Sequence, residues 1–137
     1  MTFAAKILAD SITHNGCRLV TQQITSPRII LAEFNTHRVF SRNSASTRAI
    51  PLAESIAKVQ KNPFIPVYWG KNQAGMLAAE ELTPEEIEKA RAEWLLGRDR
   101  AVQTAEAMAA LGMHKQIAGR VLEPFMYTTV IVTSTEW

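Results

Sequence analysis

The segment "AKILADSITHNGCRLVTQQIT" (residues 5–25) has two apolar, partly β-branched halves on either side of the dipeptide Asn15-Gly16. This dipeptide suits the positive φ angles of a tight hairpin turn, and strand-like runs on both sides of it are typical of paired strands. The segment therefore predicts an antiparallel hairpin, with strands over residues 5–13 and 18–25.

The other end of the chain predicts a further strand. The run "YTTVIVT" (residues 127–133) is rich in β-branched residues, which favour extended structure. Strands at both ends of a helical middle indicate an α+β fold, an antiparallel sheet with flanking helices, in place of an alternating α/β sheet.

A capping sequence marks the longest helix of that middle part. Thr83 is followed by Pro84 and, at the third helical position, by Glu86, which is the order of a capping box. We expect this helix to continue to about Leu111, where Gly112 ends it.

Shorter helices are expected on both sides of the long one. Ser26-Pro27 has the order of an N-cap and a first helical residue, and it predicts a helix over residues 28–35. Pro51 predicts the start of another helix, and a further one is expected over residues 115–122.

The totals describe a single globular domain over residues 1–137, because chains of this length usually form one core. A net charge of +2 is too small for a general nucleic-acid or membrane-surface binder. Cys17 alone permits no internal disulfide, and with no signal-peptide pattern or long apolar run we expect a cytoplasmic protein. Since the last strand stops at Trp137 without a closing loop, we expect the domain to be incomplete at its C-terminus.

The segment "NTHRVFSRNSASTRAIP" (residues 35–51) is basic and rich in hydroxyl groups. Together with the preceding helix it carries five cationic or nearly cationic side chains: Arg28, His37, Arg38, Arg42 and Arg48. Only Glu33 is an acid close in sequence, so an external anion is a natural partner, and guanidinium groups match phosphate oxygens well. The alternative is a solvated loop whose arginines pair with distant acids such as Glu80, Glu81 or Glu85, with His37 as a hydrogen-bonded structural histidine.

The spacing within this segment resembles the signature of the flavin-dependent thymidylate synthases (ThyX), R-H-R-x-x-S-x-x-x-x-S-x-R. Five of its six fixed positions are matched, by His37, Arg38, Ser41, Ser46 and Arg48. Thr36 stands where the family has its first arginine. The run "KQIAGRVLEPFMYTTVIVTSTEW" (residues 115–137) is similar to the second conserved block of the family.

The resemblance implies a reductive methylation of dUMP to dTMP, with methylenetetrahydrofolate as carbon donor and FAD, reduced by NADPH, as hydride donor. It also implies a homotetramer whose active sites draw on more than one subunit. Thr36, His37 and Arg38 would contact FAD, Thr36 through its backbone. The dUMP site would be lined by Glu33, Ser44, Ser46 and Arg48, with the last two on the phosphate.

Arg120 is a second candidate for dUMP. It is expected on a short helix among small residues, which lets a ligand approach. The structural alternative is a helix-end arginine that covers apolar surface or bonds the last carbonyls.

The chain departs from the family in ways that bear on activity. A histidine-rich segment that commonly helps to hold FAD is missing, and family members continue beyond the position of Trp137 into a helix with further flavin contacts. No catalytic residue is therefore assigned, and His14 and His114 are too scattered for a metal site. A non-catalytic nucleotide- or phosphate-binding module remains the alternative function. A nucleic-acid binder is disfavoured, because no aromatic residues alternate with the arginines.

Overall fold

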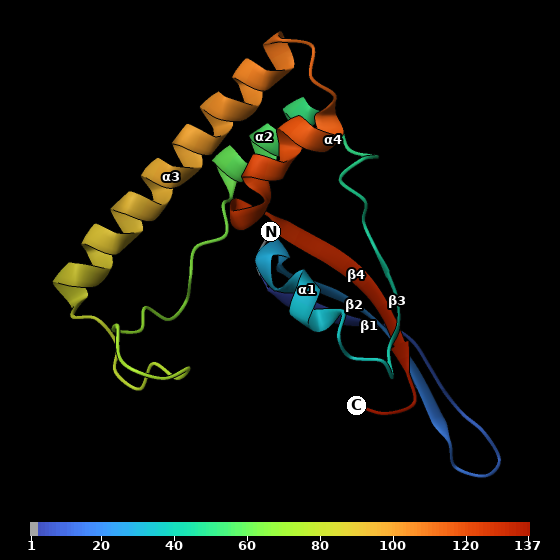
Figure 1. The fold of residues 1–137 in the computed structure, drawn as a ribbon. Helices are drawn as coiled ribbons and strands as arrows, with labels where there is room; N and C mark the ends of the chain where they lie inside the picture. Colours follow the sequence, from blue (N-terminus) through green and yellow to red (C-terminus); the bar gives the residue numbers. More distant parts are fainter. Residues whose placement is uncertain (1–2) are drawn as a thin grey trace.

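The computed structural model describes residues 3–137, which form a four-stranded antiparallel sheet with helices at one end (Figure 1). The strand order is β1-β2-β4-β3. Its strands are β1 (Ala4–Ile12), β2 (Arg18–Pro27), β3 (Ser41–Ser44) and β4 (Tyr127–Ser134). The helices are η1 (Arg28–Ile30), α1 (Leu31–Phe34), α2 (Leu52–Lys61), α3 (Pro84–Ala110), α4 (Lys115–Ala118) and η2 (Gly119–Phe125), where η denotes a 3₁₀-helix. The predicted α+β fold, an antiparallel sheet with flanking helices, is confirmed.

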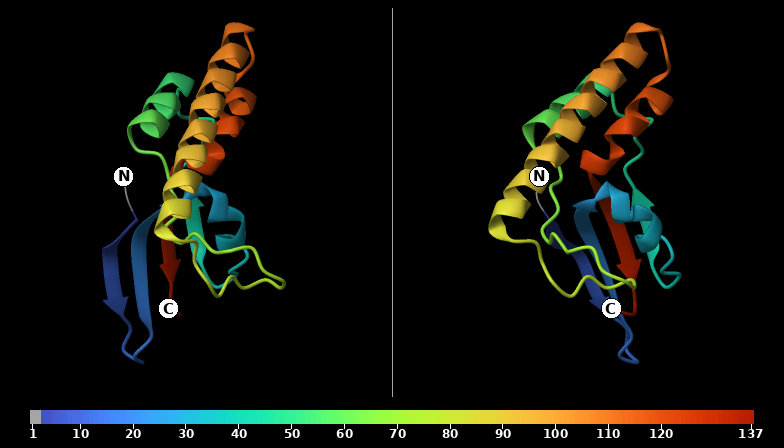
Figure 2. Two further views of the ribbon diagram at one scale, coloured as in Figure 1. Left: turned by 90° about the vertical axis from the view of Figure 1, so that its left-hand side faces the viewer. Right: turned by 60° about the vertical axis from the view of Figure 1, so that its left-hand side comes forward.

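Helices α2, α3 and α4 gather beyond the end of the sheet at which β4 begins (Figures 1 and 2). The turn between β1 and β2 projects from the opposite end. The two strands predicted from the ends of the chain become neighbours, because β2 and β4 pair at the centre of the sheet from Val20↔Ser134 to Pro27↔Tyr127.

The predicted N-terminal hairpin is confirmed, but its turn is wider than an Asn-Gly turn. The backbone amide of Thr13 donates to the Cys17 carbonyl at 2.9 Å, so three residues form the loop. Only Gly16, with φ +84°, has a positive φ there. A three-residue loop that ends in a left-handed glycine is the next most common way to join two strands.

The expected helix start at Ser26-Pro27 is wrong. Strand β2 continues through both residues, which pair with Thr128 and Tyr127 of β4, and no side chain caps η1. The helical segment that follows is divided into η1 and the four-residue α1. A partner strand lies along the whole of β2, and its ladder of hydrogen bonds outweighs the local capping preference.

The long helix begins as predicted. The Thr83 hydroxyl accepts from the backbone amide of Glu86, and Glu86 Oε2 accepts from the backbone amide of Thr83 at 2.9 Å. Helix α3 ends before Gly112, whose φ is +79°. The predicted helix at Pro51 is also confirmed as α2.

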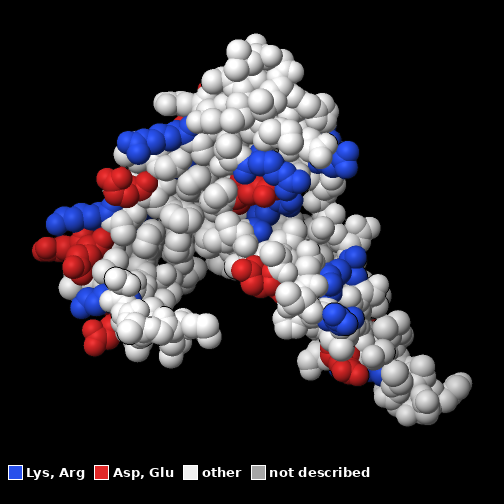
Figure 3. Space-filling model, viewed as in Figure 1, with Lys and Arg blue, Asp and Glu red and all other residues white. Residues whose placement is uncertain are grey.

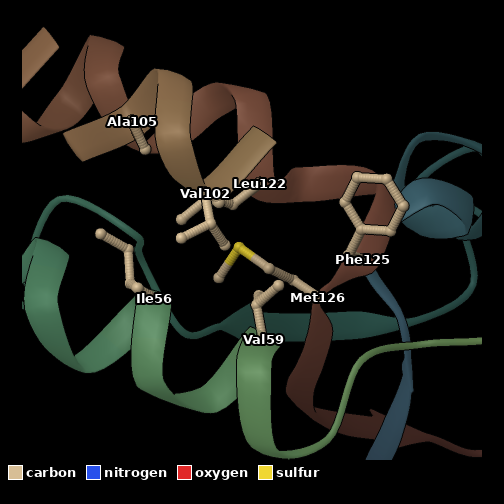
Figure 4. Close-up of a cluster of buried hydrophobic side chains, with 7 residues drawn as sticks. All are labelled: Ile56, Val59, Val102, Ala105, Leu122, Phe125 and Met126. Carbon is tan, nitrogen blue, oxygen red and sulfur yellow. The ribbon is translucent and has the colours of Figure 1, made fainter. Parts of the chain in front are cut away.

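The core lies where α2 and α3 meet η2 (Figure 4). Its buried members are Ile56, Val59, Val102, Ala105, Leu122, Phe125 and Met126. The predicted helix over residues 115–122 is shorter, since α4 gives way at Gly119 to the tighter η2, which contains Pro124. Proline has no amide hydrogen for an α-helical bond. No helix within residues 3–137 is both long and apolar enough to cross a membrane.

Candidate functional site

The basic segment of residues 35–51 is built into the sheet. It consists of a loop after α1, the short edge strand β3 and a turn that leads to α2. Strand β3 pairs with β4 from Ser41↔Thr133 to Ser44↔Val130. The segment for which the sequence predicts an anionic ligand therefore forms one edge of the sheet.

The loop after α1 is held by short-range bonds. The Thr36 hydroxyl donates to the Glu33 carbonyl at 2.7 Å, and the Thr36 amide donates to the same oxygen at 3.0 Å. The His37 amide donates to the Phe34 carbonyl at 3.3 Å. Both donors of Thr36 are therefore engaged within the chain, so its backbone can offer a ligand only the carbonyl oxygen.

Arg42 closes this loop from β3. Its guanidinium donates to the backbone carbonyls of Asn35, His37 and Phe40, the last at 3.2 Å. A planar group with five donors can satisfy three carbonyls at once. Arg42 is thus a structural clamp on the loop that carries His37 and Arg38, in contrast to the anion-binding role considered from the sequence.

Four aromatic rings stack beside the clamped loop. Phe40 lies between Phe34, at 5.8 Å between ring centroids, and Trp137, at 5.4 Å, in near-parallel arrangements. The His37 ring leans on Phe40 with a centroid distance of 5.6 Å. Sequence reasoning missed this stack, because Trp137 reaches Phe40 only through the pairing of β4 with β3. The short sequence spacing of Phe34, His37 and Phe40 was the signal that could have indicated an aromatic cluster.

The end of β4 is tied to the same loop. The Ser134 hydroxyl donates to the Glu136 carbonyl at 2.8 Å, and Trp137 Nε1 donates to the Ser134 carbonyl at 3.2 Å. These bonds set the indole against Phe40. His37, which contacts Phe40, and the next residue, Arg38, are both exposed, so a cationic side chain adjoins the aromatic stack in the sequence.

The turn after β3 presents the other half of the signature. The Ala45 amide donates to the Thr129 carbonyl at 3.2 Å, which keeps the chain on β4. The Ser46 hydroxyl then accepts from the Arg48 amide at 3.3 Å, a serine-type turn. The side chains of Ser44, Ser46 and Arg48 are exposed.

The cations of this segment have no carboxylate partners among residues 3–137. Neither Arg38, Arg42 nor Arg48 takes part in an ion pair there. The alternative in which distant acids neutralise them is wrong: Glu80 pairs with Lys71, and Glu81 accepts from the Trp69 amide. Positive charge without an internal counter-ion favours an anionic ligand.

Arg120 lies in a charged group with two other residues. Glu123 Oε1 accepts from Arg28 Nε and from Arg120 Nη1, each at 2.9 Å. Figure 3 shows this basic patch around an acidic side chain over α4 and η2. Two guanidinium groups on one carboxylate leave an excess positive charge, and the sequence did not indicate Glu123 or this role for Arg28.

The turn that carries Arg48 leads to α2, and α2 contacts the helix η2 that carries Arg120. Leu52, at the start of α2, lies 3.6 Å from the position that a Cβ on Gly119 would take. Arg48 precedes Leu52 by four residues, so their Cα atoms are at most about 14 Å apart. Arg48 lies on the turn that leads to α2 and Arg120 lies on η2, the two elements that meet at Leu52 and Gly119, whereas Thr36, His37 and Arg38 lie on the loop that precedes β3.

Glu33 is exposed on α1 and forms no ion pair with the described residues. Within residues 3–137, no three histidine, cysteine, aspartate or glutamate side chains come together as a metal site would require. A pocket of about 250 Å³ lies between α2 and the start of β4, with Val59, Phe125 and Met126 in its wall. It contains none of the predicted site residues, each of which is exposed in the single chain.

Comparison with known proteins relates this fold to a nucleotide methylase. Neither a protein-family model nor a curated protein sequence matches the chain. A crystal structure of the UMP/dUMP methylase PolB from Streptomyces cacaoi, bound with 5-Br UMP, matches with a TM-score of 0.74 at 13% identity, over 97% of this chain and 72% of that one. A second PolB structure, bound with 5-Br dUMP, matches with a TM-score of 0.61 at 14% identity, over 85% of this chain and 49% of that one. At such low identity the likeness shows a shared fold, the fold of a UMP/dUMP methylase.

Proposed function

We propose that the chain is a flavin-dependent thymidylate synthase, or the nucleotide-binding part of one, and that it binds dUMP for reductive methylation to dTMP. The observation that carries the proposal is the exposed Ser46–Arg48 turn, whose guanidinium has no carboxylate partner among the described residues. The turn leads to α2, whose Leu52 lies beside Gly119, the residue before Arg120, on a fold shared with a UMP/dUMP methylase. The match of the segment to the ThyX signature supports the same assignment.

The dUMP phosphate would be held by Ser46 and Arg48, with Arg120 as a further cation. Guanidinium forks bind phosphate oxygens in pairs, and hydroxyl groups donate to the remaining ones. Ser44 is exposed on β3, two residues before Ser46, and Glu33 offers an exposed carboxylate on α1. We assign these two to the sugar and base, whose hydroxyl and N–H groups can be bonded by such side chains.

FAD would bind at the loop that carries Thr36, His37 and Arg38. The stacked rings of Phe34, Phe40 and Trp137 supply an aromatic surface beside an arginine without a carboxylate partner in residues 3–137. Such a combination suits a flat ring joined to a diphosphate. Thr36 would contribute its carbonyl oxygen alone. When bound, FAD would supply the hydride that NADPH provides to it.

We extend the proposal to the co-substrate, the location and the assembly of the protein. Methylenetetrahydrofolate would be the carbon donor, and the protein would act in the cytoplasm as a homotetramer. The open surface of the candidate site in the single chain supports an assembly in which another copy completes it.

A non-catalytic nucleotide- or phosphate-binding module is the second candidate. One observation favours it: the candidate residues comprise cations, hydroxyls and one carboxylate on an exposed surface, none of them with a partner that would activate a nucleophile. In that case dUMP binds and FAD does not.

Binding measurements test the proposal and separate the two candidates. We expect the wild-type protein to carry or take up FAD, visible as flavin absorbance, and to gain thermal stability with dUMP. Arg48→Met removes charge-assisted bonds worth about 1.5–3 kcal/mol, so dUMP affinity should fall at least about tenfold.

Arg91→Met is the matched control. Arg91 is an exposed arginine on α3, and its replacement should leave dUMP affinity unchanged. Equal effects of the two variants, or no response of the wild type to either FAD or dUMP, would refute the proposed function.

A further inference from the structure

We propose that Glu123 is an internal stand-in for the ligand phosphate: it holds Arg120 while the site is empty and releases it when the phosphate binds. Arg28 stays on the carboxylate in both states. The inference rests on the proposed function, in that Arg120 belongs to the phosphate site. It adds a residue that controls how readily this site accepts its anion.

The geometry places both arginines on one oxygen atom. Arg28 Nε and Arg120 Nη1 each lie 2.9 Å from Glu123 Oε1. The two cations compete for the same acceptor and repel each other across it. The interaction of either arginine with Glu123 therefore becomes more favourable when another anion binds the second arginine.

Burial makes the two pairs unequal. The Arg28 side chain is 13% exposed, and its backbone amide is also fixed by a bond to the Met126 carbonyl at 2.8 Å. The Arg120 side chain is 52% exposed and contacts Glu123 from one turn earlier in η2. Water screens the Arg120 pair more strongly, and exposed pairs of this kind are weak. Arg120 is thus the exchangeable partner and Arg28 the fixed one.

The charges favour the exchange. Arg28, Arg120 and Glu123 together carry one excess positive charge. A phosphate monoester brings a charge of roughly −1.5 to −2 and more acceptor oxygens than a carboxylate. It therefore competes well for a guanidinium that is already exposed, and the Arg28–Glu123 pair remains to anchor η2 against η1.

The near-isosteric variant Glu123→Gln separates this role from a purely structural one. Its amide oxygen can still accept from Arg28, but it has no charge to hold Arg120. We expect it to bind inorganic phosphate and dUMP about three- to fivefold more tightly than the wild type, in line with the weakness of an exposed pair. Affinity for deoxyuridine, which has no phosphate, should not change.

The double variant Glu123→Gln/Arg120→Gln is the essential control. In the Arg120→Gln background, removing the Glu123 charge should give no gain in phosphate affinity, because no held arginine remains to be released. A gain that persists there would show that Glu123 acts through general electrostatics and would overturn the inference. Unchanged or weaker phosphate binding by a folded Glu123→Gln variant overturns it as well.

Arginine side-chain NMR of the wild type gives a test that needs no variant. Titration with inorganic phosphate should shift the Arg120 guanidinium signals and leave Arg28 Nε nearly unchanged. If the signals of Arg120 and Arg28 shift equally, or if neither shifts, the exchange is contradicted. If phosphate behaves as expected and dUMP does not bind, the proposed function fails and the inference about Glu123 stands.

Discussion

Replacing Arg42 by methionine should loosen the loop that carries His37 and Arg38 without unfolding the protein. Arg42 is half-buried on the edge strand β3, and its guanidinium donates to three carbonyls of residues 35–40. Methionine retains much of the aliphatic stem but none of the donors. None of residues 35–40 belongs to the core around Leu122 or to the partly buried hydrophobic residues packed against it.

The size of the effect follows from the lost bonds. The net contribution of one hydrogen bond to stability is about 0.5–1.5 kcal/mol. The three acceptor carbonyls lie on an exposed loop, where water can replace the guanidinium. Values in the lower half of this range give a total of about 2 kcal/mol. Since 1.4 kcal/mol is a factor of ten, local opening of the loop should become about 30-fold more frequent.

Amide hydrogen exchange measures this opening directly. The amides of Thr36 and His37 donate to carbonyls of α1, so they should exchange about 30-fold faster in Arg42→Met. Under the proposed function, FAD affinity should fall by a similar factor, because the ligand must order the loop again.

The matched control is Arg48→Met, in which an exposed arginine of the same segment is replaced. Exchange in the loop should be unaffected there. Unchanged exchange at Thr36 and His37 in a folded Arg42→Met variant would refute the reasoning that Arg42 is the clamp.

The remaining predictions concern stability. Leu122 is fully buried, so Leu122→Ala should cost about 3 kcal/mol, and a loss below about 1 kcal/mol in denaturant unfolding would contradict the packing described. Hydrogen bonds from the backbone amide and the hydroxyl of Thr83 lower the pKa of Glu86 in the folded protein. The ionised carboxylate therefore stabilises the fold at any pH above the pKa that Glu86 has in the unfolded chain. This contribution is lost as the pH falls through the lower pKa of the folded state. The stability difference between wild type and Thr83→Ala should therefore shrink from neutral pH to about pH 3, as thermal unfolding would reveal. Gly70→Ala would place a Cβ closer to that of Ala78 than two carbon atoms can approach. The variant should therefore unfold at a lower temperature, and an unchanged unfolding temperature would contradict the close packing of Gly70 on Ala78.

Local signals were sufficient wherever neighbours in the sequence supply the bonding partners. The capping box at Thr83, the stop at Gly112 and the hairpin around Gly16 are all satisfied by groups within a few residues. Pro51 likewise predicted the start of α2. The spacing of the basic segment indicated the candidate residues from Glu33 to Arg48, because they lie on one continuous stretch of chain; Arg120 lies outside it, on η2.

Long-range pairing decided what these signals could not. Pairing with β4 keeps Ser26 and Pro27 in strand β2, although their sequence has the order of a helix cap. Pairing with β4 also makes the polar residues 41–44 the edge strand β3. The same pairing sets Trp137 against Phe40.

By itself, then, the sequence determined the α+β class, the main helices and the basic segment, whose cations predict an anionic ligand. Only the tertiary structure decided that Arg42 is a clamp while Arg38 and Arg48 remain without carboxylate partners in residues 3–137. It also decided that Arg28 and Arg120 share Glu123, although Arg28 and Glu123 are 95 residues apart. Whether an arginine is paired depends on which carbonyls and carboxylates the fold brings within about 3 Å of it, and spacing along the chain does not contain that information.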